Sequence, residues 1–169
     1  MLEWTESNQI DGLTLRMVAS DSGLRAIDFH LTYPIAGASR NDRHPLLRET
    51  VQQLRAYFAG RLRAFDVPLD IQGTPFQKRV WRELLKIPYG KTRSYMQVAV
   101  ASGAAHAVRA VGAANGANPI PIIVPCHRVI GSDGKLTGYG GGLPRKAALL
   151  NFEFAVRLGG PGPFPPLAG

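Results

Sequence analysis

Residues 94–116, SYMQVAVASGAAHAVRAVGAANG, predict two short helices and decide the fold of the C-terminal part of the chain. Ser94 suits the N-cap of the first helix, and a glycine-containing turn separates that helix from the second. Two short helices joined in this way are typical of a helix-turn-helix. Many such pairs never touch DNA, so the pattern predicts the helices and leaves their role open.

The segments on either side complete a mainly helical domain that we place at residues 74–157. Thr74 can cap a helix that has Pro75 at its first position. A last helix is expected over residues 143–156, LPRKAALLNFEFAV, after a glycine-rich loop. The tail from residue 158 to 169 has the composition of a disordered segment. The predicted buried stripe of the helix that begins after Thr74 consists of Phe76, Val80, Trp81, Leu84 and Leu85.

The first 73 residues read as a small domain of strands and one helix. Two alternating β-type runs within residues 12–31 flank Ser20-Asp21-Ser22-Gly23, which is a hairpin signal. A helix is expected from Pro45, because apolar residues then recur at three-to-four-residue spacing until about Gly60. An extended link leads to a boundary near Gly73. The expected fold class is α+β, with a small N-terminal strand-and-helix domain and a mainly helical C-terminal domain that contains the helix-turn-helix.

Length and charge limit the classes of function. A chain of 169 residues can bury a hydrophobic core without the support of disulfides or metal ions. No apolar stretch approaches the length of a membrane span. The first residues do not resemble a secretory signal, so the expected location is cytoplasmic. The formal net charge of +8 predicts attraction to polyanions, with nucleic acid first and acidic lipid surfaces second.

The single cysteine, Cys126, lies within residues 119–131, PIPIIVPCHRVIG. A thiolate is a nucleophile, and cationic or proton-accepting neighbours such as His127 and Arg128 increase its fraction. Most free cysteines are instead small buried hydrophobes, and this alternative stays open from composition alone. One cysteine excludes an internal disulfide, and the four histidines are scattered, so we expect no metal site.

The longer string NPIPIIVPCHRVIG, followed by GKLTGYGGGLPRKAALLNFE, resembles the active-site region of the O6-alkylguanine-DNA alkyltransferases, also called methylated-DNA–protein-cysteine methyltransferases. The resemblance extends from about Pro75 to Glu153. It includes FQKRVWRELLKIPYGKTRSY and RAVGAANGANP, with matching order and spacing. The first seventy residues resemble the variable N-terminal domain of this family only in size and in strand-then-helix pattern.

The resemblance implies direct DNA repair by irreversible transfer of a methyl or other alkyl group from O6 of guanine, and also O4 of thymine, in duplex DNA to Cys126. A thiolate attacks the alkyl carbon and displaces the base, and the resulting thioether is stable. Each molecule therefore acts once and needs no cofactor. The implied partner is double-stranded DNA that contains O6-alkylguanine. The protein is expected to be a monomer without a membrane partner, and cooperative binding on DNA is left open.

The resemblance also assigns roles to single residues. Cys126 matches the acceptor thiol, His127 the imidazole that activates it through a water, and Glu153 the carboxylate that orients the imidazole. Tyr95 matches the phenol that donates a proton toward the leaving guanine, and Asn118 braces the active-site turn. Without the resemblance, Glu153 reads as a surface glutamate and Tyr95 as ordinary helix packing.

Four further residues match the family's substrate pocket. The backbone of Val129 is expected to bind the guanine edge. Tyr139 and Gly140 belong to the loop that walls the pocket, and Lys146 to the helix behind it. Because some relatives have a serine where this chain has Gly140, any contact to O6 there must come from a backbone amide.

DNA binding is expected at Arg109, Ala110, Tyr95 and Arg128. Guanine O6 is reached only after the nucleotide is flipped out of the duplex, and Arg109 matches the arginine that fills the vacated space. A minor groove about 6 Å wide rejects bulky helices. The small face of the second helix fits such a groove, although the same residues could mark tight packing. This face consists of Ala107, Ala110, Gly112, Ala113 and Ala114.

Two other classes of protein remain as alternatives. One is a lesion-binding module without transfer activity, like the alkyltransferase-like proteins, which replace the cysteine that this chain retains as Cys126. The other is a cysteine hydrolase, which would turn over many substrates, whereas an alkyltransferase stops after one.

Overall fold

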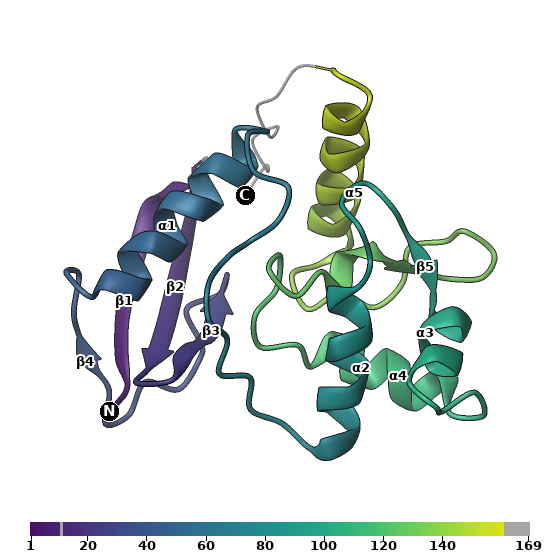
Figure 1. Ribbon diagram of the computed structural model, residues 1–169, viewed down its shortest axis with the longest axis horizontal. Coiled ribbons are helices and arrows are strands. Elements are labelled where there is room, and N and C mark those ends of the chain that lie inside the picture. Colours follow the sequence, from purple (N-terminus) through teal and green to yellow (C-terminus); the bar gives the residue numbers. More distant parts are fainter. Residues whose placement is uncertain (11, 161–169) are drawn as a thin grey trace.

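The computed structural model describes residues 1–10 and 12–160 (Figure 1). A sheet with one long helix across it forms the N-terminal part, and short helices and loops form the C-terminal part. The predicted α+β fold class is confirmed. Most of the predicted disordered tail, residues 161–169, lies outside the described residues.

The N-terminal sheet has the strand order β3-β2-β1-β4. The strands are β1 (Glu3–Ile10), β2 (Leu13–Ser20), β3 (Gly23–Asp28) and β4 (Ser39–Arg40). The predicted hairpin is present as the antiparallel pair β2 and β3, whereas β1, which pairs with both β2 and β4, was not predicted. At Gly23 a Cβ would lie 2.7 Å from the carbonyl oxygen of Pro68, so the close approach of the link requires glycine there.

Helix α1 (Pro45–Phe58) lies across this sheet and begins at the predicted proline. Its buried residues include Leu47, Leu54 and Phe58, so the predicted apolar spacing marks the face that packs inward. Residues 59–74 then descend between the two parts of the molecule (Figure 1). They bind the edge of β3 through hydrogen bonds at Leu24.

Helices α2 (Pro75–Leu85) and α3 (Tyr95–Ala101) both start with a capping box. Thr74 and Ser94 are the N-caps, as predicted, and each accepts a hydrogen bond from the backbone of the glutamine three residues later. Within α2, Val80, Trp81 and Leu84 are buried, but Leu85 is 44% exposed. The predicted stripe is therefore wrong at Leu85, which turns away from the core.

Helix α4 (Val108–Gly116) begins later than the sequence suggests. The preceding residues form a turn, in which the amide of Ala107 donates to the carbonyl of Ala104, and no side chain caps the helix. Helix α4 packs against α2 and α3. The indole nitrogen of Trp81 donates to the carbonyl of Ala114 at 2.8 Å and fixes α2 on α4.

The remaining elements surround the single cysteine. Cys126 opens the short 3-10 helix η1 (Cys126–Arg128), and β6 (Val129–Ile130) follows and pairs in parallel with β5 (Arg93–Ser94). Helix α5 (Leu143–Arg157) contacts η1. The 3-10 helix that carries the cysteine therefore packs against both α5 and α2, and β6 after it contacts α3. Across the described ranges, no helix has the length and apolar character needed to cross a membrane.

Candidate active site

Cys126 is almost fully buried, at 4% exposure, and borders a pocket. Burial raises the pKa of its thiol to about 11, against the opposing effects of a hydrogen bond from Asn118 and the charge of Lys146. At neutral pH the sulfur is therefore a thiol and needs a base before it can attack.

Asn118 braces the turn that leads to the cysteine. Its amide nitrogen donates to the carbonyl of Val124 at 2.8 Å, and its amide oxygen accepts from the backbone of Ile120 at 3.0 Å. Within this turn Ile122 has a φ of +75°, a conformation that a β-branched residue rarely adopts. The two bonds of Asn118 span the strained residue and hold the turn in place.

Glu153 is fully buried and binds both residues that follow the cysteine. Its Oε1 lies 2.8 Å from Nε2 of His127, and Arg128 donates to both carboxylate oxygens at 2.9 Å. Glu153 also accepts from the hydroxyl of Tyr57 at 2.7 Å and from the amide of Gly90 at 3.1 Å. It is therefore the centre of a buried polar network rather than a surface glutamate.

The protonation states within this network follow from its contacts. Burial alone would raise the pKa of Glu153, but hydrogen bonds from His127 and Arg128 outweigh it and lower the pKa well below its usual range. Burial lowers the pKa of His127 although Glu153 opposes this. A neutral imidazole beside an ionised carboxylate carries its proton on Nε2. The lone pair is then on Nδ1, which is buried and has no hydrogen-bond partner among the described residues.

Tyr95 and Lys146 meet at the loop after the cysteine. The hydroxyl of Tyr95 donates to the carbonyl of Thr137 at 2.7 Å, and Nζ of Lys146 lies 2.7 Å from the same carbonyl and 3.3 Å from the Tyr95 oxygen. Lys146 is fully buried, and burial lowers its pKa to about 8. A buried amine next to a phenol can stabilise negative charge on that phenol.

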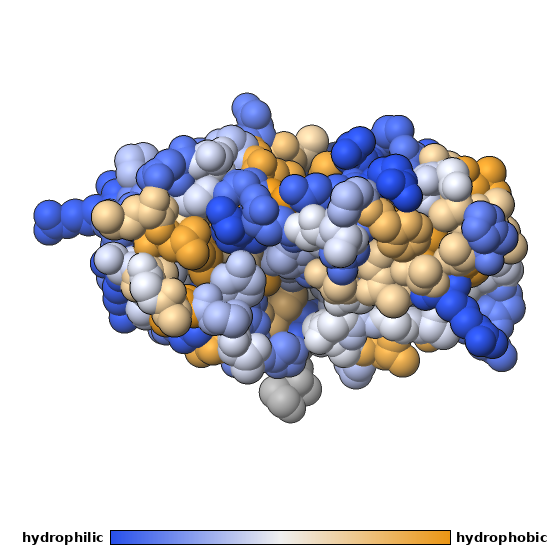
Figure 2. All heavy atoms as spheres, turned by 90° about the horizontal axis from the view of Figure 1, so that it is seen from below, coloured by the Kyte–Doolittle hydropathy of each residue, from blue (hydrophilic) through white to orange (hydrophobic). Residues whose placement is uncertain are grey.

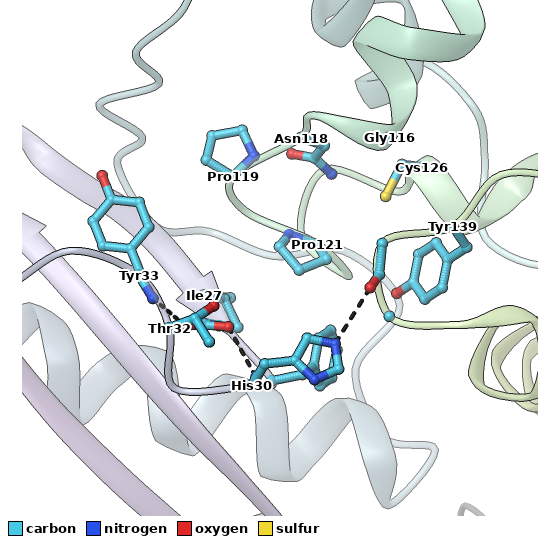
Figure 3. Close-up of a pocket in the computed structure, with 14 residues that line it drawn as sticks. Ile27, His30, Thr32, Tyr33, Gly116, Asn118, Pro119, Pro121, Cys126 and Tyr139 are labelled. Atoms are coloured by element: carbon cyan, nitrogen blue, oxygen red, sulfur yellow. Dashed lines mark hydrogen bonds between the residues drawn. The ribbon is translucent and has the colours of Figure 1, made fainter.

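The pocket brings together Cys126, Asn118, Tyr139 and Gly140, four of the residues predicted for the site (Figure 3). Burial raises the pKa of Tyr139, whose hydroxyl is buried and has no partner within the described ranges. Val129 is buried in β6 and is not one of the described residues that line the pocket.

Arg109 and Ala110 lie apart from the pocket, exposed on α4 together with Ala113. Of the predicted small face, Ala114 is buried in the core instead, and Ala107 and Gly112 are half-buried. The exposed face is thus narrower than the sequence suggests, but it is free of bulky apolar side chains. Figure 2 views the molecule from the side on which α3 and α4 lie, and its right-hand half carries pale apolar surface beside hydrophilic side chains.

Arg128 does not lie where a DNA contact requires it. It is only 7% exposed, and its three guanidinium nitrogens donate to Glu153 and to the carbonyl of Ile87. The predicted DNA contact is therefore wrong in this structure, because Arg128 neutralises the buried carboxylate.

The sequence reasoning missed Tyr57 and Gly90 as partners of Glu153. It also missed the N-terminal wall of the pocket, which includes Phe29 and His30. These contacts join residues up to 110 positions apart, and no local signal marks them. Among the described residues, no group of three or more His, Cys, Asp or Glu side chains could hold a metal ion.

Fold and site together define a two-part α+β protein with a buried Cys-His-Glu constellation at a pocket. Two domain families match the chain: the ribonuclease-like domain of 6-O-methylguanine DNA methyltransferase at residues 14–71, and the DNA binding domain of the same protein at residues 75–155. The curated methylated-DNA–protein-cysteine methyltransferase of Methanosarcina barkeri is 49% identical over 142 residues, which is 81% of this chain and 88% of that protein. The chain belongs to the methylated-DNA–protein-cysteine methyltransferase family.

Mycobacterial relatives are also similar. The enzyme of the same name from Mycobacterium tuberculosis is 68% identical over 103 residues, 61% of this chain, and the match spans only 62% of the length of that relative. The crystal structure of Mycobacterium tuberculosis OGT in complex with DNA superimposes with a TM-score of 0.83 at 46% identity and covers 95% of both chains.

The raised pKa of Cys126 predicts how its reactivity depends on pH. Since only the thiolate reacts, labelling by iodoacetamide should rise about tenfold per pH unit and keep rising above pH 9. Glutathione, an unburied thiol, should level off near pH 9 under the same conditions. Intact-mass measurements of the labelling rate check this, and a plateau below pH 9 for Cys126 would contradict the effect of burial.

Proposed function

We propose that this protein repairs DNA by transferring an alkyl group from O6 of guanine to Cys126. The observation that carries the proposal is the buried cysteine that precedes a neutral His127, whose Nε2 is bound to the ionised Glu153. The names of the relatives support the same activity. Action on O4 of thymine, a single turnover, a monomeric state and a cytoplasmic location are parts of this proposal.

The first step is removal of the thiol proton. Nδ1 of His127 accepts it through a bridging water, and Glu153 stabilises the imidazolium that forms. The sulfur of Cys126 then attacks the alkyl carbon, so that a carbon–sulfur bond forms as the bond from this carbon to O6 breaks.

The second requirement is a proton for the departing guanine anion. The phenol of Tyr95 supplies it, and the ammonium of Lys146, 3.3 Å from the phenol oxygen, stabilises the resulting phenolate. Asn118 keeps the turn before the cysteine in its strained shape. The thioether that remains has no leaving group, so the thiol is not regenerated.

DNA reaches this site through the helix pair α3 and α4, which we propose to act as a helix-turn-helix. The exposed Ala110 and Ala113 allow α4 to enter the minor groove, and Arg109 inserts into the base stack while the damaged nucleotide is flipped out. The solved complex of the mycobacterial relative with DNA supports this partner. With a net charge of +8, binding should be nearly independent of base sequence and should weaken with salt.

Mass spectrometry after incubation with a short duplex that contains one O6-methylguanine tests the proposal. The expected result is the mass of a single methyl group on the Cys126 peptide, never exceeding one per protein and absent from Cys126→Ala. Binding of the duplex without gain of mass would favour a lesion-recognition module. Continued turnover without a modified cysteine would favour a hydrolase.

A further inference from the structure

One wall of the pocket at Cys126 comes from the N-terminal part of the chain. Residues 28–33, which begin at the last residue of β3, contribute Phe29, His30 and Thr32 to this wall. Figure 3 shows His30 across the pocket from the sulfur of Cys126. The C-terminal part alone therefore does not enclose the pocket.

The segment 28–33 has a fixed shape. The carboxylate of Asp28 accepts hydrogen bonds from the backbone amides of His30 and Tyr33, and Leu31 adopts a left-handed φ of +57°. Just before the segment, the amide of Ile27 donates to the carbonyl of Pro119 at 2.9 Å. The segment is thus attached at its start to the turn that carries Asn118.

Two contacts connect this wall with the opposite one. Nε2 of His30 donates to the carbonyl of Gly140 at 3.3 Å, as the dashed line in Figure 3 indicates. The guanidinium of Arg145 lies 4.3 Å from the ring centre of Phe29 and donates to the carbonyl of Gly141 at 2.7 Å. Gly140 and Gly141 add no side chains to the pocket, so Phe29 and His30 supply bulk there together with the ring of Tyr139.

The chemistry of the base predicts what would meet this wall. In an O6-alkylated guanine the sugar is attached at one end of the purine and the alkyl group at the other. The sugar stays with the DNA on the side of α4, whose last residue, Gly116, also borders the pocket. An O6 substituent larger than methyl therefore extends away from α4, toward residues 28–33.

We propose that residues 28–33 limit the size of the O6 substituent, with His30 and its bond to Gly140 holding the two walls together. This inference rests on the proposed alkyl transfer. The bond is a single one, made by an exposed side chain, so its loss opens the wall without unfolding the protein.

The test compares the rates of transfer from O6-benzylguanine and O6-methylguanine, each placed in the same duplex. In His30→Ala the ratio of the benzyl rate to the methyl rate should rise about tenfold over the native protein, as expected for a pocket relieved of a few atoms. In His30→Gln, whose amide can still donate to Gly140, the ratio should return most of the way to the native value. Phe29→Ala, which removes bulk from the same wall, should raise the ratio as well.

His44→Ala is the matched control, because His44 bonds Glu3 away from the pocket. It should leave the ratio unchanged. If the ratio stays the same or falls in both His30→Ala and Phe29→Ala, the inference is overturned. The proposed function still stands in that case, provided that the native protein transfers the methyl group. Failure of the native protein to accept either group overturns the proposed function, and the inference with it.

Discussion

Glu153→Gln is expected to lower the free energy of unfolding by about 3–5 kcal/mol, because it leaves the buried charge of Arg128 without its partner. The carboxylate receives hydrogen bonds from His127, Arg128, Tyr57 and Gly90, and an amide cannot accept all of them. The NH2 group of the introduced glutamine would face one of these donors and could not accept a hydrogen bond from it. Alkyl transfer should fall as well, since His127 loses the group that fixes its tautomer.

Thermal unfolding checks this prediction, and the expected drop in Tm is on the order of 10 °C. Glu49→Gln is the matched control, since Glu49 is exposed on α1 and accepts a hydrogen bond from the exposed side chain of Gln53, and its effect should stay within about 0.5 kcal/mol. Adding Arg128→Met to Glu153→Gln removes the unpaired charge and should restore part of the stability. If the double variant is as unstable as the two single effects added together, buried charge is not the cause.

The same network sets how stability depends on pH. Because the pKa of Glu153 is lower in the folded protein than its ordinary value of 4.5, the stabilisation is complete above that pH and is lost as the pH falls below it. The lowered pKa of His127 acts in the same direction below pH 6.5. The difference in stability between the native protein and Glu153→Gln should therefore shrink on acidification.

Arg109→Ala is expected to slow methyl transfer from duplex DNA by about 10–100-fold, which corresponds to the few kcal/mol that flipping a nucleotide costs. Arg109 is exposed on α4 and is not one of the residues that line the pocket. Transfer from free O6-benzylguanine needs no flipping and should change by less than about twofold. Single-turnover rates on the two substrates separate access to the base from chemistry at the sulfur.

Arg48→Ala provides the control for the loss of one positive charge, since Arg48 is exposed on α1 in the N-terminal part. It should lower the duplex rate much less than Arg109→Ala does. Equal losses in the two variants would mean that Arg109 contributes only general attraction to phosphates.

Local sequence signals predicted the helices better than the sheet. Thr74 and Ser94 mark helix starts because each forms a capping box with the glutamine three residues later, and both partners are visible in the local sequence. Strand β1 carries only a weak alternation, and its pairing with β2 and β4 is a property of the assembled sheet. The sequence does not fix the start of α4 at Val108, because nothing in it distinguishes helical alanines from those in the preceding turn.

The candidate site could be predicted from sequence where a motif is contiguous, but not where its partners are distant. Cys126 and His127 are adjacent, so one short motif was enough to propose both of them. The burial of Glu153 depends on Tyr57, 96 residues earlier, and on Arg128, which the sequence assigned to DNA instead. A charged residue on the inner face of α5 departs from the apolar pattern, and only its partners explain it.

The burial of Cys126 also bears on how long the protein keeps its capacity to act. Oxidants attack the thiolate, and a pKa of about 11 leaves very little thiolate at neutral pH. Under the proposed function each molecule is consumed by one lesion, so one that is oxidised while waiting is lost. The low fraction of thiolate therefore has two consequences. It makes the sulfur depend on His127 for activation, and it slows oxidation of the sulfur before the protein meets a lesion.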